Sequence, residues 1–298
     1  MAASNPALWV GLSLVAICWP LNWLLPGVRT SYLFFPLWLG YILTGDGLTL
    51  LRSGTSLLTR SRADFARLFI ISAPAWQLFE WINHRTRNWE YLGSDHFGPV
   101  SYFLISTLCF STVVPAVLET AEFVATFRRI KALSPRRLFQ LTTMKTAAFF
   151  LAGCLMLALT LTWPRIFYPL VWGGIFLIVD PINHWSGRPS LLARVAAGDW
   201  KSVVSLALGA LICGWFWEMW NYYSYPKWIY HTPGVGFCHI FEMPALGFLG
   251  YIPFAWEVFA LAYFAWPKPL RIENKATFTI DETAIDLGGQ SYNTDIMV

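Results

Sequence analysis

Gly214-Trp-Phe-Trp-Glu-Met-Trp-Asn221 is an apolar, aromatic stretch that carries one carboxylate, Glu218, and one carboxamide, Asn221. The spacing of three places both polar side chains on one face of a helix. A weaker copy lies upstream, in Gln77-Leu-Phe-Glu-Trp-Ile-Asn83, and carries Glu80 and Asn83. The two copies predict an internal duplication of the chain.

The composition is that of a membrane protein. Of the 298 residues, 56% are apolar and only 13% are charged, and 17 are Trp. A soluble domain carries about 25% charged residues, so the fold class is predicted to be all-α and polytopic. Eight apolar segments are long enough to cross a bilayer. They lie at about 7–25, 31–51, 67–83, 98–123, 146–163, 166–183, 202–222 and 237–265. Pro253 is expected to break the eighth.

The basic residues predict the orientation. Sixteen of the 21 Lys and Arg residues fall on the side that holds both termini. The positive-inside rule therefore predicts cytoplasmic termini, in the inner (plasma) membrane of a cell, with the Glu–Asn pairs near the opposite face. The same residues sit in short interhelical loops, so nucleic acid is not an expected partner, whereas membrane lipids are.

The duplication predicts two repeats of four helices. Asp46 and Arg60 match Asp180 and Arg194 at one constant offset, and Glu80, Asn83 and Glu119 match Glu218, Asn221 and Glu257 at another. An even number of helices per repeat gives both repeats the same orientation. The expected organisation is a first repeat at 1–127, a basic cytoplasmic linker at 128–145, a second repeat at 146–266 and a polar cytoplasmic tail at 267–298.

Intramembrane carboxylates are the candidate catalytic groups, because an Asp at the centre of a span costs roughly 2.5–3.5 kcal/mol. A carboxyl in apolar surroundings can stay protonated and donate a proton to a double bond. The alternative is that each Glu hydrogen bonds a neighbour and fixes helix packing. The candidate catalytic residues are Glu80, Asn83, Glu218, Asn221, Glu119 and Glu257.

A substrate pocket is predicted from further polar and aromatic residues. Asp180 either caps a following turn or forms a proton or substrate site with Glu257. The aromatic residues near Glu218 are typical of an interfacial belt, and the alternative is a pocket whose rings stabilise a cation. The candidate pocket residues are Asp46, Asp180, His184, Trp217 and Trp228.

No metal and no cofactor are expected. His84 lies one helical turn after Glu80, and His239 and Glu242 have the Glu-x-x-His spacing of di-metal bundles in reverse. The proposed duplication does not repeat these histidines, so they are weak candidates. The five cysteines form no CxxC pair, and no nucleotide-binding or hydrolase motif occurs.

Three segments resemble the membrane lycopene cyclases, small multi-helix proteins with a Pro-x-Glu-Glu-x-x-x-Phe-Phe signature. The segments are Trp228-Ile-Tyr-His-Thr-Pro, Glu242-Met-Pro-Ala-Leu-Gly and Ile252-Pro-Phe-Ala-Trp-Glu257-Val-Phe. The chain lacks the adjacent Glu pair, and its repeats have four helices rather than three. The resemblance implies that Glu257 and Glu119 handle protons and that the substrate is a long isoprenoid.

Three functions fit the sequence. The first is an enzyme that acts on a lipid or isoprenoid through buried carboxylates. The second is a non-enzymatic subunit that contacts partner membrane subunits, with Thr277-Phe-Thr-Ile280 as a short strand for a partner. The third is a small-solute transporter with its site on the repeat axis.

Overall fold

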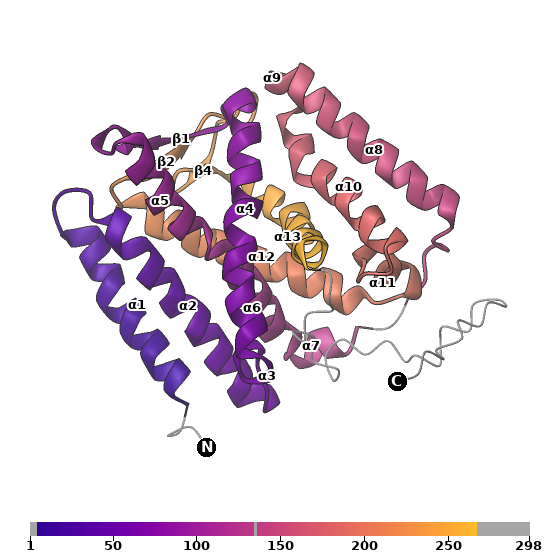
Figure 1. Ribbon diagram of the computed structural model, residues 1–298, viewed down its shortest axis with the longest axis horizontal. Coiled ribbons are helices and arrows are strands. Elements are labelled where there is room, and N and C mark those ends of the chain that lie inside the picture. The colour runs from indigo at the N-terminus through magenta and orange to yellow at the C-terminus, as the bar shows by residue number, and fades with distance from the viewer. Residues whose placement is uncertain (1–4, 134–135, 267–298) are drawn as a thin grey trace.

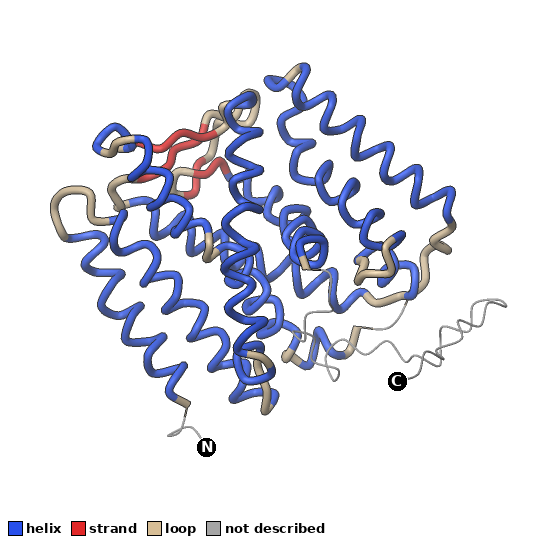
Figure 2. Tube along the Cα trace, viewed as in Figure 1, coloured by secondary structure: helices blue, strands red, loops and turns tan. Residues whose placement is uncertain are grey.

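A computed structural model describes residues 5–133 and 136–266 of the chain. The part described is mostly helical, with two short strand pairs and connecting loops (Figure 2). The long helices are α1 (Pro6–Leu24), α2 (Thr30–Ser53), α4 (Arg62–Thr86), α5 (Pro99–Phe110), α6 (Val113–Ala125), α8 (Thr143–Thr162), α10 (Val171–Trp185), α12 (Trp200–Tyr222) and α13 (Tyr251–Ala265). The short helices are α3 (Leu57–Arg60), α7 (Arg128–Lys131), α9 (Pro164–Phe167) and α11 (Leu191–Ala197), with 3-10 turns η2 (Ser94–His96), η3 (Tyr168–Leu170) and η4 (Ala245–Gly250).

The described residues contain seven helical segments that are long and apolar enough to cross a membrane. The chain is therefore a mostly helical, multi-pass membrane protein, as its composition predicts. The remaining predicted segment, 67–83, lies within α4, which is 25 residues long but more polar than the other long helices. The predicted strand at 277–280 falls outside the described residues.

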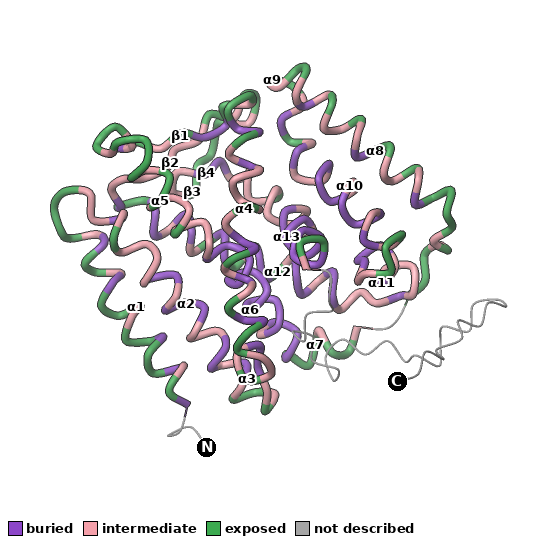
Figure 3. The backbone as a smooth tube through the Cα atoms, viewed as in Figure 1, coloured by how far each residue is buried: buried purple, intermediate pink, exposed green. Residues whose placement is uncertain are grey.

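Two outer helix pairs enclose a central group of helices. In Figure 1, α1 and α2 pack together at one side of the molecule and α8 and α10 at the other. Between them, α12 packs against α6 and α13. The buried residues concentrate on these central helices, and nearly every residue of α6 is buried (Figure 3). Polar groups on the central helices are therefore kept away from lipid.

Prolines mark the starts of α6 and α13. Pro115 lies in the first turn of α6, and Pro253 lies in the first turn of α13. A proline is tolerated there because the first N–H groups of a helix have no intrahelical partner. Pro253 thus lies where α13 begins, and the predicted eighth segment is divided just before it, between η4 and α13. The first residues of that segment form strands β3 (His239–Ile240) and β4 (Met243–Pro244) instead.

Candidate functional site

Two short strands form an aromatic ribbon at one end of the bundle. β1 (Trp89–Leu92) pairs antiparallel with β2 (Lys227–Tyr230). Trp89 lies opposite Tyr230, and Tyr91 lies opposite Trp228. Directly opposed residues face the same side of a sheet, and so do alternate residues of one strand. All four rings therefore share one face of the ribbon.

Two asparagines attach the ribbon to the helix ends. Asn221, near the end of α12, donates from Nδ2 to the Trp228 carbonyl at 2.7 Å and accepts from the Trp228 N–H at 2.9 Å. Asn83, near the end of α4, donates to the Trp89 carbonyl at 2.7 Å and accepts from the Asn88 N–H at 2.8 Å. Each carboxamide satisfies backbone groups of the ribbon and so fixes its position.

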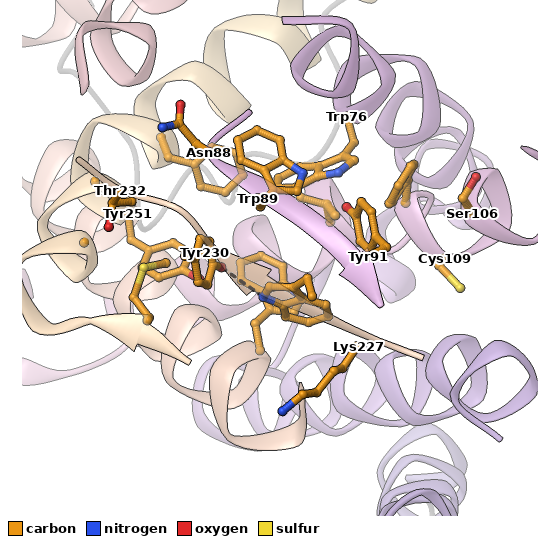
Figure 4. Close-up of a pocket in the computed structure, with 18 of the residues that line it drawn as sticks. Trp76, Asn88, Trp89, Tyr91, Ser106, Cys109, Lys227, Tyr230, Thr232 and Tyr251 are labelled. Carbon is orange, nitrogen blue, oxygen red and sulfur yellow. Dashed lines mark hydrogen bonds between the residues drawn. The ribbon is translucent and has the colours of Figure 1, made fainter. Parts of the chain in front are cut away.

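The aromatic face of the ribbon covers a cavity of about 460 Å³ (Figure 4). This volume is within the range of small-molecule sites, which are mostly apolar with a few polar groups. All four ribbon rings line the cavity, and among the predicted pocket residues Trp217 and Trp228 line it. Helices α2, α4, α5, α10, α12 and α13 complete the wall.

Glu80 lies behind the cavity wall. Its Oε1 accepts hydrogen bonds from Trp76 Nε1 at 2.8 Å, Trp89 Nε1 at 3.1 Å and the Tyr91 hydroxyl at 2.5 Å. Each of these three donors lines the cavity. A candidate catalytic carboxylate is thus separated from the cavity by a single layer of aromatic side chains.

Glu218 has a corresponding position behind the opposite part of the wall. Its side chain is completely buried, and Oε1 accepts from the Tyr230 hydroxyl at 2.7 Å and the Tyr251 hydroxyl at 2.8 Å. Trp228 Nε1 in turn donates to the Tyr230 oxygen at 2.9 Å. The second carboxyl oxygen of Glu218, Oε2, is buried without a hydrogen-bond partner.

The two ribbon tyrosines are neutral over the physiological range. Desolvation in the cavity wall, followed by the nearby carboxylates, raises the pKa of Tyr91 and Tyr230 well above 10. Glu80 acts on Tyr91 and Glu218 acts on Tyr230. A neutral phenol keeps both its donor and its acceptor capacity, which a proton transfer requires.

Glu119 and Glu257 lie in the core and do not line this cavity. Both are completely buried, on α6 and α13 respectively. Glu119 lies beside the Asp46 carboxyl, whereas Glu257 Oε1 accepts from the Phe176 N–H at 3.4 Å. The structure therefore places the two carboxylates singled out by the lycopene cyclase resemblance apart from the cavity lining.

The predicted pocket residues Asp46, Asp180 and His184 do not line the cavity either. Asp46 accepts from the Ser56 hydroxyl and the Leu58 N–H, both at 2.9 Å. Asp180 makes the corresponding bonds from α10 to the start of α11, and His184 lies in the last turn of α10. The two aspartates thus bind helix N-termini, a structural role typical of carboxylates.

The weak metal candidates are dispersed at the surface. His84 and His239 are exposed, and Glu242 pairs with the Lys227 ammonium. Within residues 5–133 and 136–266, no group of three or more His, Cys, Asp or Glu side chains is placed to hold a metal ion.

Three tyrosines were not among the predicted site residues. Tyr91 and Tyr230 belong to a Trp-x-Tyr pattern that follows each Glu–Asn pair, and this recurrence was the available signal. Tyr251 comes from α13 and contacts Glu218 across the bundle. No local spacing in the sequence connects those two residues.

Comparison with known proteins adds no relative. No protein-family model, curated protein or solved structure matches the chain. The fold and the site together define a multi-pass membrane protein whose aromatic cavity is backed by buried carboxylates.

Proposed function

We propose that the protein is a membrane enzyme that binds an apolar lipid or isoprenoid in the aromatic cavity and exchanges protons with it. One observation carries the proposal. Tyr91 and Tyr230 line the cavity, and each hydroxyl is hydrogen bonded to a glutamate behind the wall. This arrangement connects an acid group to an apolar chamber, where general acid–base chemistry needs no soluble cofactor.

The chemistry we propose is a double-bond isomerisation or cyclisation. A proton moves from a tyrosine–glutamate pair to one alkene carbon, and the π electrons form the new C–H bond. The resulting cation is stabilised by the faces of the surrounding rings, and in a cyclisation the π electrons of a second double bond in the same molecule attack it to form the new C–C bond. A proton then leaves a neighbouring carbon and returns to the pair. Protons balance over the cycle, so no oxidant or reductant is needed.

An isoprenoid is the preferred substrate class. The resemblance to membrane lycopene cyclases supports it, as does the aromatic character of the lining. In this proposal a glutamate behind the cavity wall takes the role that the resemblance implies for Glu119 and Glu257. An apolar lining also favours a lipid ligand over the small polar solute of a transporter.

Deuterium exchange tests this function. The purified protein is incubated in D2O with squalene or with a total membrane lipid extract, and the recovered lipids are analysed by mass spectrometry. We expect deuterium in at least one unsaturated lipid. Cys109→Trp, which fills the cavity from α5, abolishes the incorporation, whereas the control Leu108→Trp on the exposed side of α5 retains it. Absence of deuterium from every recovered lipid would contradict the proposal.

We further propose that eight spans form two repeats of four helices. Matching contacts support the duplication. The Ser56 hydroxyl donates to Asp46 at 2.9 Å, and the Ser190 hydroxyl donates to Asp180 at 2.7 Å. The ribbon register is also consistent with a two-fold relation, because each Trp of one strand lies opposite the Tyr of the other.

The proposed orientation places both termini in the cytoplasm and the ribbon outside, in an inner (plasma) membrane. The excess of Lys and Arg on the terminal side supports it. Cysteine accessibility to an impermeant reagent tests it. In a variant whose exposed Cys238 is replaced by serine, a cysteine introduced at Ser94, beside the ribbon, is expected to react in intact cells, whereas one at Ala132, after α7, is not.

A further inference from the structure

We propose that the two glutamates behind the cavity have different roles. Glu218, with Tyr230 and Tyr251, exchanges protons with the ligand, and Glu80 holds the wall in place. This inference rests on the proposed function and assigns its chemistry to one of two similar sites. The evidence is a difference in their hydrogen-bond donors.

The difference begins four residues before each glutamate. Trp76 precedes Glu80 by one helical turn and donates to it, whereas the same position before Glu218 is Gly214. A side chain at Gly214 would collide with the ring of Tyr251. The missing indole is thus replaced by a phenol from α13, whose hydroxyl donates to Glu218 at 2.8 Å.

This replacement changes what each site can do with a proton. An indole N–H donates a hydrogen bond but does not accept one, whereas a hydroxyl does both. Two indoles and one phenol hold Glu80, so only Tyr91 can relay a proton from it. Glu218 is held by two phenols, and both line the cavity. Glu218 therefore has two hydroxyl routes to a ligand.

The second oxygens also differ. Glu218 Oε2 is buried without a partner, in a side chain that is completely enclosed. The carboxyl is therefore expected to carry a proton, because burying an unpaired oxygen ionised is costly. For delivery the proton lies on Oε1, the oxygen that Tyr230 contacts, and the Tyr230 hydroxyl turns toward the ligand. The proton passes from Oε1 to the Tyr230 oxygen as the Tyr230 proton forms the new C–H bond, and the return transfer restores both groups.

Matched substitutions test this assignment in the deuterium experiment with squalene and the lipid extract. We expect Glu218→Gln to lower incorporation by about 100-fold or more, the lower end of general acid–base effects. Glu80→Gln is expected to stay within about 3-fold of the wild type while its thermal unfolding temperature falls. Bound lipid, measured by mass spectrometry, is expected to remain in both variants.

A second pair of variants tests the same assignment if a glutamine variant fails to fold. Tyr251→Phe keeps the ring and removes one relay hydroxyl, and we expect a loss of incorporation of about 10-fold. The control Tyr41→Phe removes a hydroxyl that bonds Thr120 away from the cavity lining, and it is expected to retain the wild-type rate. Loss of incorporation in Glu80→Gln, with retention in Glu218→Gln and Tyr251→Phe, would overturn the assignment and leave the proposed function intact. A wild type that incorporates no deuterium overturns both.

Discussion

At the scale of single residues, polar side chains in this protein satisfy backbone groups where regular structure ends. Asn83 and Asn221 bind the first strand residues, and Asp46 and Asp180 bind the starts of short helices. Buried backbone groups without partners are costly, so these side chains are expected to be structural. The chemistry that we propose is assigned instead to Glu218, whose hydrogen-bond donors are cavity side chains.

Replacement of Asn221 tests the structural role. Asn221→Ala leaves the N–H and C=O of Trp228 without their partner, and we expect a loss of about 1–3 kcal/mol of stability. Thermal or urea unfolding in detergent measures it. Asn221→Asp retains the acceptor and is expected to lose less. An unchanged midpoint for the alanine variant would show that the ribbon is held by other contacts.

The raised pKa of the ribbon tyrosines predicts that the folded protein loses stability at alkaline pH. The pKa of Tyr91 and Tyr230 is raised in the folded protein, so both stay neutral where a tyrosine of the unfolded chain, with a pKa of about 10, ionises. The associated stability is fully present below pH 10 and is lost as the pH rises above it. Unfolding midpoints measured between pH 9 and 11.5 are expected to fall, and less steeply in a Tyr91→Phe, Tyr230→Phe double variant.

At the scale of elements, the cavity is shaped by the break between α5, which ends at Phe110, and α6, which begins at Val113. α5 lines the cavity and has no fully buried residue, whereas nearly all of α6 is buried. The Ser72 hydroxyl, from α4, bridges the break by donating to the Phe110 carbonyl at 2.5 Å and accepting from the Val114 N–H at 3.0 Å. This single side chain therefore sets the angle between wall and core.

Ser72→Ala is expected to loosen the break. The substitution leaves two buried backbone groups unpaired, which predicts a loss of about 1–3 kcal/mol. Ser106 offers a matched control, because its hydroxyl bonds only the Phe103 carbonyl within α5. Hydrogen exchange followed by mass spectrometry is expected to show faster exchange around residues 110–114 in the Ser72 variant alone. Equal exchange in both variants would exclude the bridging role.

At the scale of the whole molecule, the sequence predicts the helices better than the site. Long apolar runs mark the spans because the bilayer imposes their length. The four-residue strands carry no such signal, and Tyr251 reaches Glu218 from 33 positions away in the chain. The spacing of residues in the sequence predicts which side chains are neighbours on one helix or strand. This cavity, however, is formed by contacts between different helices and strands. Glu80 and Glu218 were found because charge is rare within spans.

Expression of the two proposed repeats as separate polypeptides tests whether the repeats associate with each other. Two polypeptides, 1–134 and 135–298, are expected to co-purify when co-expressed, because helix contacts and the ribbon join them. The second fragment alone is expected to accumulate less, since β2 would lack its partner strand. Size-exclusion chromatography in mild detergent measures the association. Fragments that fold separately but do not associate would contradict the paired arrangement.

The register of the ribbon has a consequence for how the cavity can change. β1 and β2 pair only with each other in their sheet, and each comes from a different half of the chain. Neither half can therefore move its strand away from the cavity without leaving backbone groups of the other strand unbonded. Movement of the ribbon is therefore an event of both halves together, and loss of either strand leaves the other without its partner.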